Sequence, residues 1–153
     1  MTLSISSPTF GEGDKIPPEY TCEGQDISPQ LDWRDIPKEA KSLALIVDDP
    51  DAPGGTFTHW VIFNLPPDSN GLSEALPLTP KLSDDSVQGG NDFGKIGYGG
   101  PCPPPGKPHR YLFSLYALSK QLDLGAGSSK YQVLDAIKGH ILAQGQLTGI
   151  YQR

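Results

Sequence analysis

Two histidines and two aspartates are the residues of this chain whose side chains could form a binding site. They are His59, His109, Asp49 and Asp51, and the two aspartates lie only two positions apart. Carboxylates accept hydrogen bonds from imidazole N–H groups, which fixes the histidine tautomer or favours the imidazolium form. An anion could then bind on the far side of the ring. On spacing alone a simpler interpretation is favoured, in which the aspartates only cap a turn.

The aspartates belong to the segment Asp-Pro-Asp-Ala-Pro at positions 49–53. Pro50 and Pro53 fix their own φ angles and remove backbone donors, and each restricts the residue before it to extended geometry. The two carboxylates are therefore expected to be held in one conformation, at the end of a strand where sites are often built.

A second segment, residues 97–111, is rich in glycine and proline and ends in His-Arg-Tyr. Glycines let a backbone approach a ligand closely, and prolines make the wall of a site stiff. His109 and Tyr111 lie two positions apart in a predicted strand, so their side chains point to the same face. Arg110 points to the opposite face, where we expect it to form a structural ion pair.

The elements that must position these residues are mostly strands. Apolar and β-branched patterns predict strands at residues 3–5, 30–33, 41–47, 56–65, 110–118 and 146–151. Residues 10–30 and 66–108 read as long loops, with one helical turn expected at 73–76. Loops of this length inside a domain are usually functional.

One helix is predicted at residues 129–143. Ser129 and Gln132 have the spacing of a capping box, and apolar residues follow at helical intervals. Gly145 fits the end of such a helix. His140 would lie on its solvated face.

Length and charge restrict the class of protein. The chain has 153 residues and a net charge of −6, which predicts a single domain spanning residues 1–153 and excludes a nucleic-acid binder that relies on a basic surface. No apolar run approaches the roughly 20 residues that span a bilayer, so we do not expect an integral membrane protein. The N-terminal residues do not resemble a signal peptide, and a cytoplasmic location is expected.

The chain contains two cysteines, Cys22 and Cys102. In a cytoplasmic protein two free thiols are expected. A disulfide between their loops remains the alternative, because sequence cannot show whether the two Cα atoms lie within bonding range.

The two segments together resemble the defining motifs of the phosphatidylethanolamine-binding proteins, also called Raf-kinase-inhibitor-like proteins. The first motif is Asp-Pro-Asp-Ala-Pro at 49–53 with His-Trp at 59–60, and the second runs from Gly-Pro at 100–101 to His-Arg-Tyr at 109–111. Thr-Cys-Glu-Gly at 21–24 resembles the compact prokaryotic branch of the family.

This resemblance implies a mainly β protein, a Greek-key β-sandwich with one or two short peripheral helices. It also implies a surface pocket for small anions such as phosphate or phosphoethanolamine, without catalysis and without a cofactor. The residues that it assigns to the pocket are Asp49, Asp51, Pro53, His59, Gly100, Pro101, His109 and Tyr111. Whether the Ala52–Pro53 bond is cis, as a tight turn can require, is left open by the sequence.

The resemblance further implies partners. Some family members inhibit kinases or serine proteases, and loops 10–30 and 66–96 would be the surface that contacts such a target. The compact members of the family imply a homodimer. The chain lacks the C-terminal helix of eukaryotic members, which puts partners that need that helix in doubt.

Two other uses of the same residues are considered. Two histidines and two aspartates could bind zinc or iron, although aspartates used as ligands could no longer orient the histidines. A hydrolytic enzyme could use Cys102 as a nucleophile near His109, but neither a Gly-x-Ser-x-Gly elbow nor a phosphate-binding loop is present.

Overall fold

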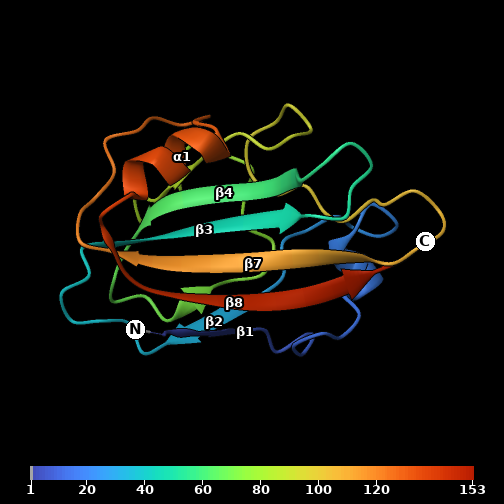
Figure 1. Cartoon of the computed structure of the whole chain (residues 1–153), viewed down its shortest axis with the longest axis horizontal. Coiled ribbons are helices and arrows are strands. Elements are labelled where there is room, and N and C mark those ends of the chain that lie inside the picture. Colours follow the sequence, from blue (N-terminus) through green and yellow to red (C-terminus); the bar gives the residue numbers. More distant parts are fainter. Residues whose placement is uncertain (1) are drawn as a thin grey trace.

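A computed structural model describes residues 2–153 and shows two antiparallel β-sheets and one short α-helix (Figure 1). The larger sheet has the strand order β6-β4-β3-β7-β8, and the smaller one the order β1-β2-β5. The elements are β1 (Ser4–Ser6), a 3₁₀ helix (Pro18–Tyr20), β2 (Leu31–Arg34), β3 (Ser42–Asp49), β4 (Phe57–Leu65), β5 (Gly71–Leu72), β6 (Val87–Gln88), β7 (His109–Leu118), α1 (Lys130–Ile137) and β8 (Ile141–Tyr151). The predicted mainly β fold with one or two short helices is confirmed.

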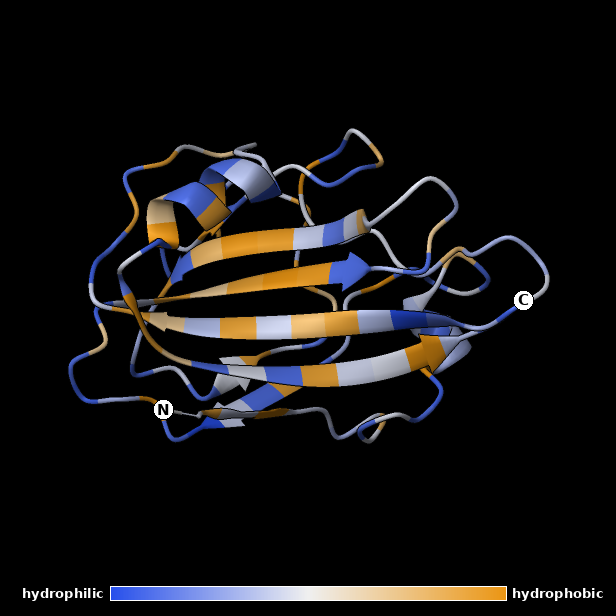
Figure 2. Ribbon diagram, in the orientation of Figure 1, coloured by the Kyte–Doolittle hydropathy of each residue, from blue (hydrophilic) through white to orange (hydrophobic). Residues whose placement is uncertain are grey.

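The larger sheet is covered on both faces. The smaller sheet packs on one face through side chains such as Leu31 and Trp33, and α1 covers the other with Val133 and Ile137 (Figure 1). Strands buried on both faces read as continuous apolar runs. This explains the unbroken hydrophobic colour of the middle of β3 and β4 in Figure 2.

The larger sheet contains a Greek key. Strands β3, β4 and β6 lie side by side, and β7 returns after the long segment 89–108 to pair with β3. The spatial order β7-β3-β4-β6 is therefore the 4-1-2-3 order of that motif, with β5 diverted to the smaller sheet. This return places the start of β7 beside the end of β3.

The predicted helix is correct at its start and wrong at its end. The Ser129 hydroxyl accepts from the Gln132 N–H and the Gln132 side chain accepts from the Ser129 N–H, so the capping box is confirmed. The helix ends at Ile137, because Gly139 has a φ of +77° and the chain turns there. Ile141 begins β8, whose hydrogen bonds to β7 outweigh local helical preference.

This early turn also changes two neighbouring predictions. His140 lies between helix and strand, where its carbonyl accepts from Ser119 N–H, and not on the helix. Gly145 lies inside β8, where an added Cβ would be 2.4 Å from the carbonyl oxygen of Leu3. It therefore permits close packing of the N-terminal segment and does not end a helix.

The segment 66–108 is a long excursion that contains only the two-residue strands β5 and β6. The helical turn predicted at 73–76 is not formed; Ala75 N–H instead donates to the carbonyl of Ser28 and ties the excursion to an earlier loop. Among residues 2–153, no helix is both long enough and apolar enough to cross a bilayer.

Candidate functional site

The predicted site residues come from three neighbouring strands at one end of the larger sheet. Asp49 ends β3, His59 lies near the start of β4, and His109 and Tyr111 begin β7. Since β3 lies between β4 and β7 in antiparallel pairing, its last residue is flanked by the first residues of both. Sheet topology thus brings together residues that are up to 62 positions apart in sequence, from Asp49 to Tyr111.

His59 reaches this site because of a β-bulge. Val47 pairs with Trp60 and the next residue of β3, Asp48, pairs with Thr58, so His59 is the extra residue of β4. A bulge breaks the alternation of side chains and re-aims one of them. His59 therefore lies on the same face as Trp60, against the Tyr111 ring at 5.2 Å between centroids. Strict alternation would have turned it toward α1.

The His59 ring is oriented by one backbone segment. Its Nδ1 lies 2.6 Å from the carbonyl oxygen of Gly99, and the Gly99 N–H donates back to the His59 carbonyl at 2.9 Å. Nδ1–H is thus the donor to Gly99, which leaves Nε2 as the ring nitrogen available to a ligand. Burial lowers the pKa of the His59 imidazole below its ordinary value, although the Gly99 carbonyl and the Asp49 carboxylate act in the opposite direction.

This lowered pKa makes a prediction about stability. Below a pH of about 6.5 the unfolded chain binds a proton at His59 more readily than the folded chain does, so the free energy of unfolding falls as pH falls. We expect His59→Gln to lose this part of the pH dependence. Urea unfolding of both proteins between pH 7.5 and 5.5 measures it. Parallel curves for the two proteins would contradict the assignment.

His109 is oriented by a carboxylate. Its Nδ1 lies 2.6 Å from Oδ2 of Asp49, and both residues are buried, with 8% and 3% of their surface exposed. The second oxygen of Asp49 accepts from the Asp51 N–H at 2.8 Å. Asp49 therefore both turns Nε2 of His109 outward and stabilises the turn that follows β3.

Tyr111 completes the polar part of the site. Its hydroxyl oxygen is buried and has no hydrogen-bond partner among residues 2–153. Burial raises the pKa of this hydroxyl, and the nearby Asp49 carboxylate raises it further, so Tyr111 stays protonated. A buried hydroxyl without a partner is rare, and this one lies beside the Asp49 carboxylate in the wall of the cavity.

These side chains line a cavity of about 160 Å³. Of the predicted pocket residues, five line it: Asp49, Pro53, His59, His109 and Tyr111. Six residues were missed: Ala52, Phe57, Phe93, Cys102, Pro103 and Pro104. Five of these lie within the stretches spanned by the two quoted motifs, 49–60 and 100–111, but Phe93 comes from the irregular segment 89–108 and no sequence pattern marks it. The walls are mainly apolar and the polar groups few, as is usual for ligand sites.

Asp51 does not line this cavity. Its carboxylate forms a two-pronged ion pair with Arg110, with Oδ2 2.9 Å from Nε and Oδ1 2.9 Å from Nη2. Hydrogen bonds from the Arg110 side chain and backbone lower the pKa of Asp51 to about 2. Asp51 is thus turned toward Arg110 and away from this cavity, and the structural ion pair expected for Arg110 is confirmed.

Gly100 and Pro101 also lie behind the pocket and do not line it. The Gly100 N–H donates to Oδ1 of Asp26 at 2.7 Å, and the Pro101 carbonyl accepts from the Cys22 N–H at 3.1 Å. An added Cβ at Gly100 would be 2.4 Å from the Tyr20 carbonyl oxygen, so glycine is required there. These residues hold the wall in place.

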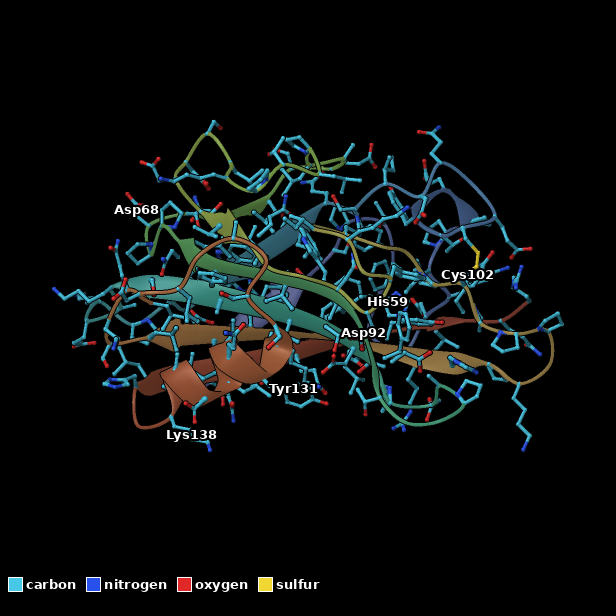
Figure 3. All side chains as sticks on the ribbon, turned by 90° about the horizontal axis from the view of Figure 1, so that it is seen from above. His59, Asp68, Asp92, Cys102, Tyr131 and Lys138 are labelled. Carbon is cyan, nitrogen blue, oxygen red and sulfur yellow. A yellow bond between two sulfur atoms is a disulfide. The ribbon has the colours of Figure 1, made fainter. Side chains whose placement is uncertain are left out.

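Cys22 and Cys102 form a disulfide, with Cα atoms 5.4 Å apart. The expectation of two free thiols is therefore wrong, because the loops that carry the cysteines meet beside the pocket. Figure 3 shows the sulfur atoms near the end of the sheet that carries His59. A disulfide offers no thiolate, so in this state Cys102 cannot be the nucleophile of a hydrolytic enzyme.

Two further expectations concern the pocket. No peptide bond within residues 2–153 is cis, so the Ala52–Pro53 bond, whose isomer the sequence left open, is trans. Gly54 and Gly55, with φ angles of +89° and +121°, reverse the chain instead. In the part of the chain that the structure describes, no three His, Cys, Asp or Glu side chains converge as metal ligands would.

Comparisons with known proteins identify the family and the fold. A family model described as phosphatidylethanolamine-binding protein matches residues 6–152. A UPF0098 protein of Methanothermobacter thermautotrophicus is 55% identical over 151 residues, which cover 99% of both chains. A UPF0098 protein of Aquifex aeolicus is 48% identical, with 99% of this chain and 89% of the relative covered.

Two solved structures resemble the fold of this chain over nearly its whole length. The phosphatidylethanolamine-binding protein homologue CT736 of Chlamydia trachomatis superposes with a TM-score of 0.91 and is 42% identical in sequence. The match covers 99% of this chain and 98% of the CT736 chain. Escherichia coli YbcL, described as a member of the mammalian family, has a TM-score of 0.92 and 33% identity over 100% and 99% of the two chains. The chain belongs to the phosphatidylethanolamine-binding protein family.

Proposed function

We propose that the chain is a non-enzymatic binding protein that takes a small anion, such as phosphate or a phosphoethanolamine-like group, in the cavity between His59 and His109. One observation carries this proposal. Both histidines line the same cavity, and in both the Nδ1 atom is engaged by the protein itself. Both Nε2 atoms are therefore left for a ligand, and each becomes a donor when its ring is protonated.

The surroundings support an anion that is held locally. The chain has a net charge of −6, so its overall field does not attract anions. An imidazolium inside an apolar cavity acts in a medium of lower effective dielectric than water, where its attraction for an anion is stronger. The Tyr111 hydroxyl supplies a further donor.

The proposal predicts that binding weakens as pH rises. A histidine must be protonated for its Nε2 to donate, so the affinity for phosphate should fall between pH 5.5 and pH 8. Titration with inorganic phosphate, followed through the histidine ring signals by NMR, measures it. Equal affinity at both pH values would contradict the role of histidine charge. If the NMR signals of His59 and His109 do not change when phosphate is added, phosphate does not bind in this pocket.

The finer assignments implied by the family also remain proposals. If the chain inhibits a kinase or serine protease, loops 10–30 and 66–96 would form the contact surface. Whether it assembles as a homodimer is a separate proposal, which light scattering measures. A cytoplasmic location remains a prediction. The Cys22–Cys102 disulfide is an observation against it. Disulfides are common in oxidising compartments and rare in the cytosol of mesophiles.

A further inference from the structure

The Cys22–Cys102 disulfide is part of the wall of the anion pocket. Cys102 lines the cavity together with the next two residues, Pro103 and Pro104, so the cross-link joins this stretch of wall to an earlier loop. Figure 3 shows Cys102 at the same end of the sheet as His59. Breaking this one covalent bond therefore acts on the pocket without changing the side chains that would bind the anion.

The loop that carries Cys22 is a fixed anchor. The buried Tyr98 hydroxyl donates to the Tyr20 carbonyl at 2.6 Å. The Thr21 hydroxyl, also buried, donates to the Pro18 carbonyl at 2.8 Å. Neither hydrogen bond involves a cysteine side chain, so both remain when the disulfide is broken. The wall at Cys102 is thus the side of the cross-link that reduction sets free.

This wall is short of backbone donors. Residues 103–105 are three successive prolines, which have no N–H group. Beyond them the Gly106 N–H donates to the Arg153 carbonyl at 3.2 Å, and Nε of Arg153 donates to the Pro103 carbonyl at 2.6 Å. These bonds fasten the far end of the wall to the C-terminal residues and leave the end at Cys102 to be fastened by other means.

The end of the wall at Cys102 is fastened by the disulfide and by hydrogen bonds close to it. The Cys22 N–H donates to the Pro101 carbonyl at 3.1 Å, and the Gly100 N–H donates to Oδ1 of Asp26 at 2.7 Å. Local hydrogen bonds of a loop open and close far more readily than a covalent bond does. Loss of the disulfide therefore loosens this end while the far end stays tied.

The disulfide is open to reagents in solution. Cys22 and Cys102 are both exposed, and both line a second hollow of about 330 Å³ beside the pocket. Exposed disulfides are more labile than structural ones and are often regulatory. A thiol can therefore approach this bond while the chain remains folded.

We propose that the Cys22–Cys102 disulfide is a redox switch of the anion pocket. The thiolate of a dithiol reductant attacks one sulfur, which breaks the S–S bond, forms a mixed disulfide and releases the other cysteine as a thiolate. The second thiol of the reductant then displaces the remaining cysteine and closes the reductant's own disulfide. Two electrons pass to the chain, and two protons complete its thiols. The wall at Cys102 is then released.

Release of the wall weakens the binding of the anion. A wall that becomes ordered only when the ligand binds takes this conformational cost from the affinity. A loose wall also admits water, which weakens the attraction between an imidazolium and the anion. The oxidised chain therefore binds the anion more tightly than the reduced chain. This inference rests on the proposed function and adds the regulation of that site.

Phosphate titration of the oxidised and the reduced chain tests the switch. The full chain is reduced with dithiothreitol, a neutral dithiol that does not compete with phosphate as an anion, and is then desalted under nitrogen at pH 6. Thiol titration establishes the reduction, and near-UV circular dichroism establishes that the chain is folded. Calorimetry with inorganic phosphate should give an affinity about three- to tenfold lower than that of the oxidised chain. Reoxidation should restore the affinity.

The matched control is the Cys22→Ala/Cys102→Ala protein. It should bind inorganic phosphate as weakly as the reduced wild type, because both lack the cross-link. Treatment with dithiothreitol should leave its affinity unchanged. A loss of affinity in the variant after this treatment would show that the reductant acts elsewhere and would contradict the switch.

The switch and the anion pocket can fail separately. If the folded reduced chain binds phosphate as well as the oxidised chain does, the switch is wrong and the pocket stands. If the oxidised chain does not bind phosphate, the proposed function fails and the switch fails with it. Thiols that appear only after denaturation, or a reduced chain that loses its near-UV circular dichroism, would show a purely structural cross-link and overturn the switch.

Discussion

Replacing His109 with Gln is expected to weaken phosphate binding by about one to two orders of magnitude. A hydrogen bond from a charged donor contributes about 1.5–3 kcal/mol, and glutamine offers no positive charge. The change also removes the ring whose Nδ1 lies 2.6 Å from Oδ2 of Asp49, so the Asp49 carboxylate no longer orients a donor toward the anion. Both effects act in the same direction. Calorimetry with inorganic phosphate at pH 6 measures the loss, after circular dichroism has established that the variant is folded.

The neighbouring residue is the matched control. Arg110 also carries positive charge and begins the same strand, but its side chain is more than half exposed and is bound to Asp51 on the opposite face. Its charge is exposed to salt and already paired with the Asp51 carboxylate, so little of it acts on an anion in the pocket. Arg110→Gln should therefore change phosphate affinity by less than about twofold. Equal losses in both variants would show that general charge, and not the His109 position, attracts the anion.

Removing the disulfide should lower the free energy of unfolding by about 2–4 kcal/mol. Cys22 and Cys102 are separated by 80 residues, and a cross-link that closes so long a loop restricts the unfolded chain strongly. A loss of this size is a large fraction of the stability of a typical domain. Urea unfolding of the Cys22→Ala/Cys102→Ala protein, beside the oxidised wild type, measures it.

The reduced wild type serves as the control for this prediction. It should unfold at nearly the same urea concentration as the double variant, because both lack the cross-link. Adding reductant to the double variant should change nothing. If the oxidised and reduced wild-type proteins unfold together, the cross-link does not stabilise the folded chain.

Local patterns predicted much of the fold. The strands at β3, β4 and β7 could be located because a strand buried on both faces has an unbroken apolar sequence. The start of α1 could be located because a capping box is encoded within four residues. The end of α1 was placed too late although Gly139 is a local stop signal, because apolar residues continue at helical spacing to Leu142, and Ile141 and Leu142 belong to β8, which pairs with the distant β7.

The residues of the site likewise divide into those that a sequence pattern located and those whose position depends on distant contacts. Motif spacing led to Asp49, His59, His109 and Tyr111, and all four line the cavity. It did not show that the Asp51 carboxylate is turned away from the cavity, because this depends on its meeting Arg110 at the start of β7, which lies far along the chain. It could not find Phe93, whose position depends on hydrogen bonds to β4 and on the space above Gly99.

The sequence by itself therefore determined which side chains have the right chemistry and which strands carry them, since residue type and strand alternation are local properties. Only the tertiary structure decided which of them meet. The bulge at His59 turns that ring into the pocket, the Greek-key return of β7 brings His109 to Asp49, and the meeting of two loops joins Cys22 to Cys102. Each of these contacts joins residues that are distant along the chain or departs from regular alternation, so no local pattern records it.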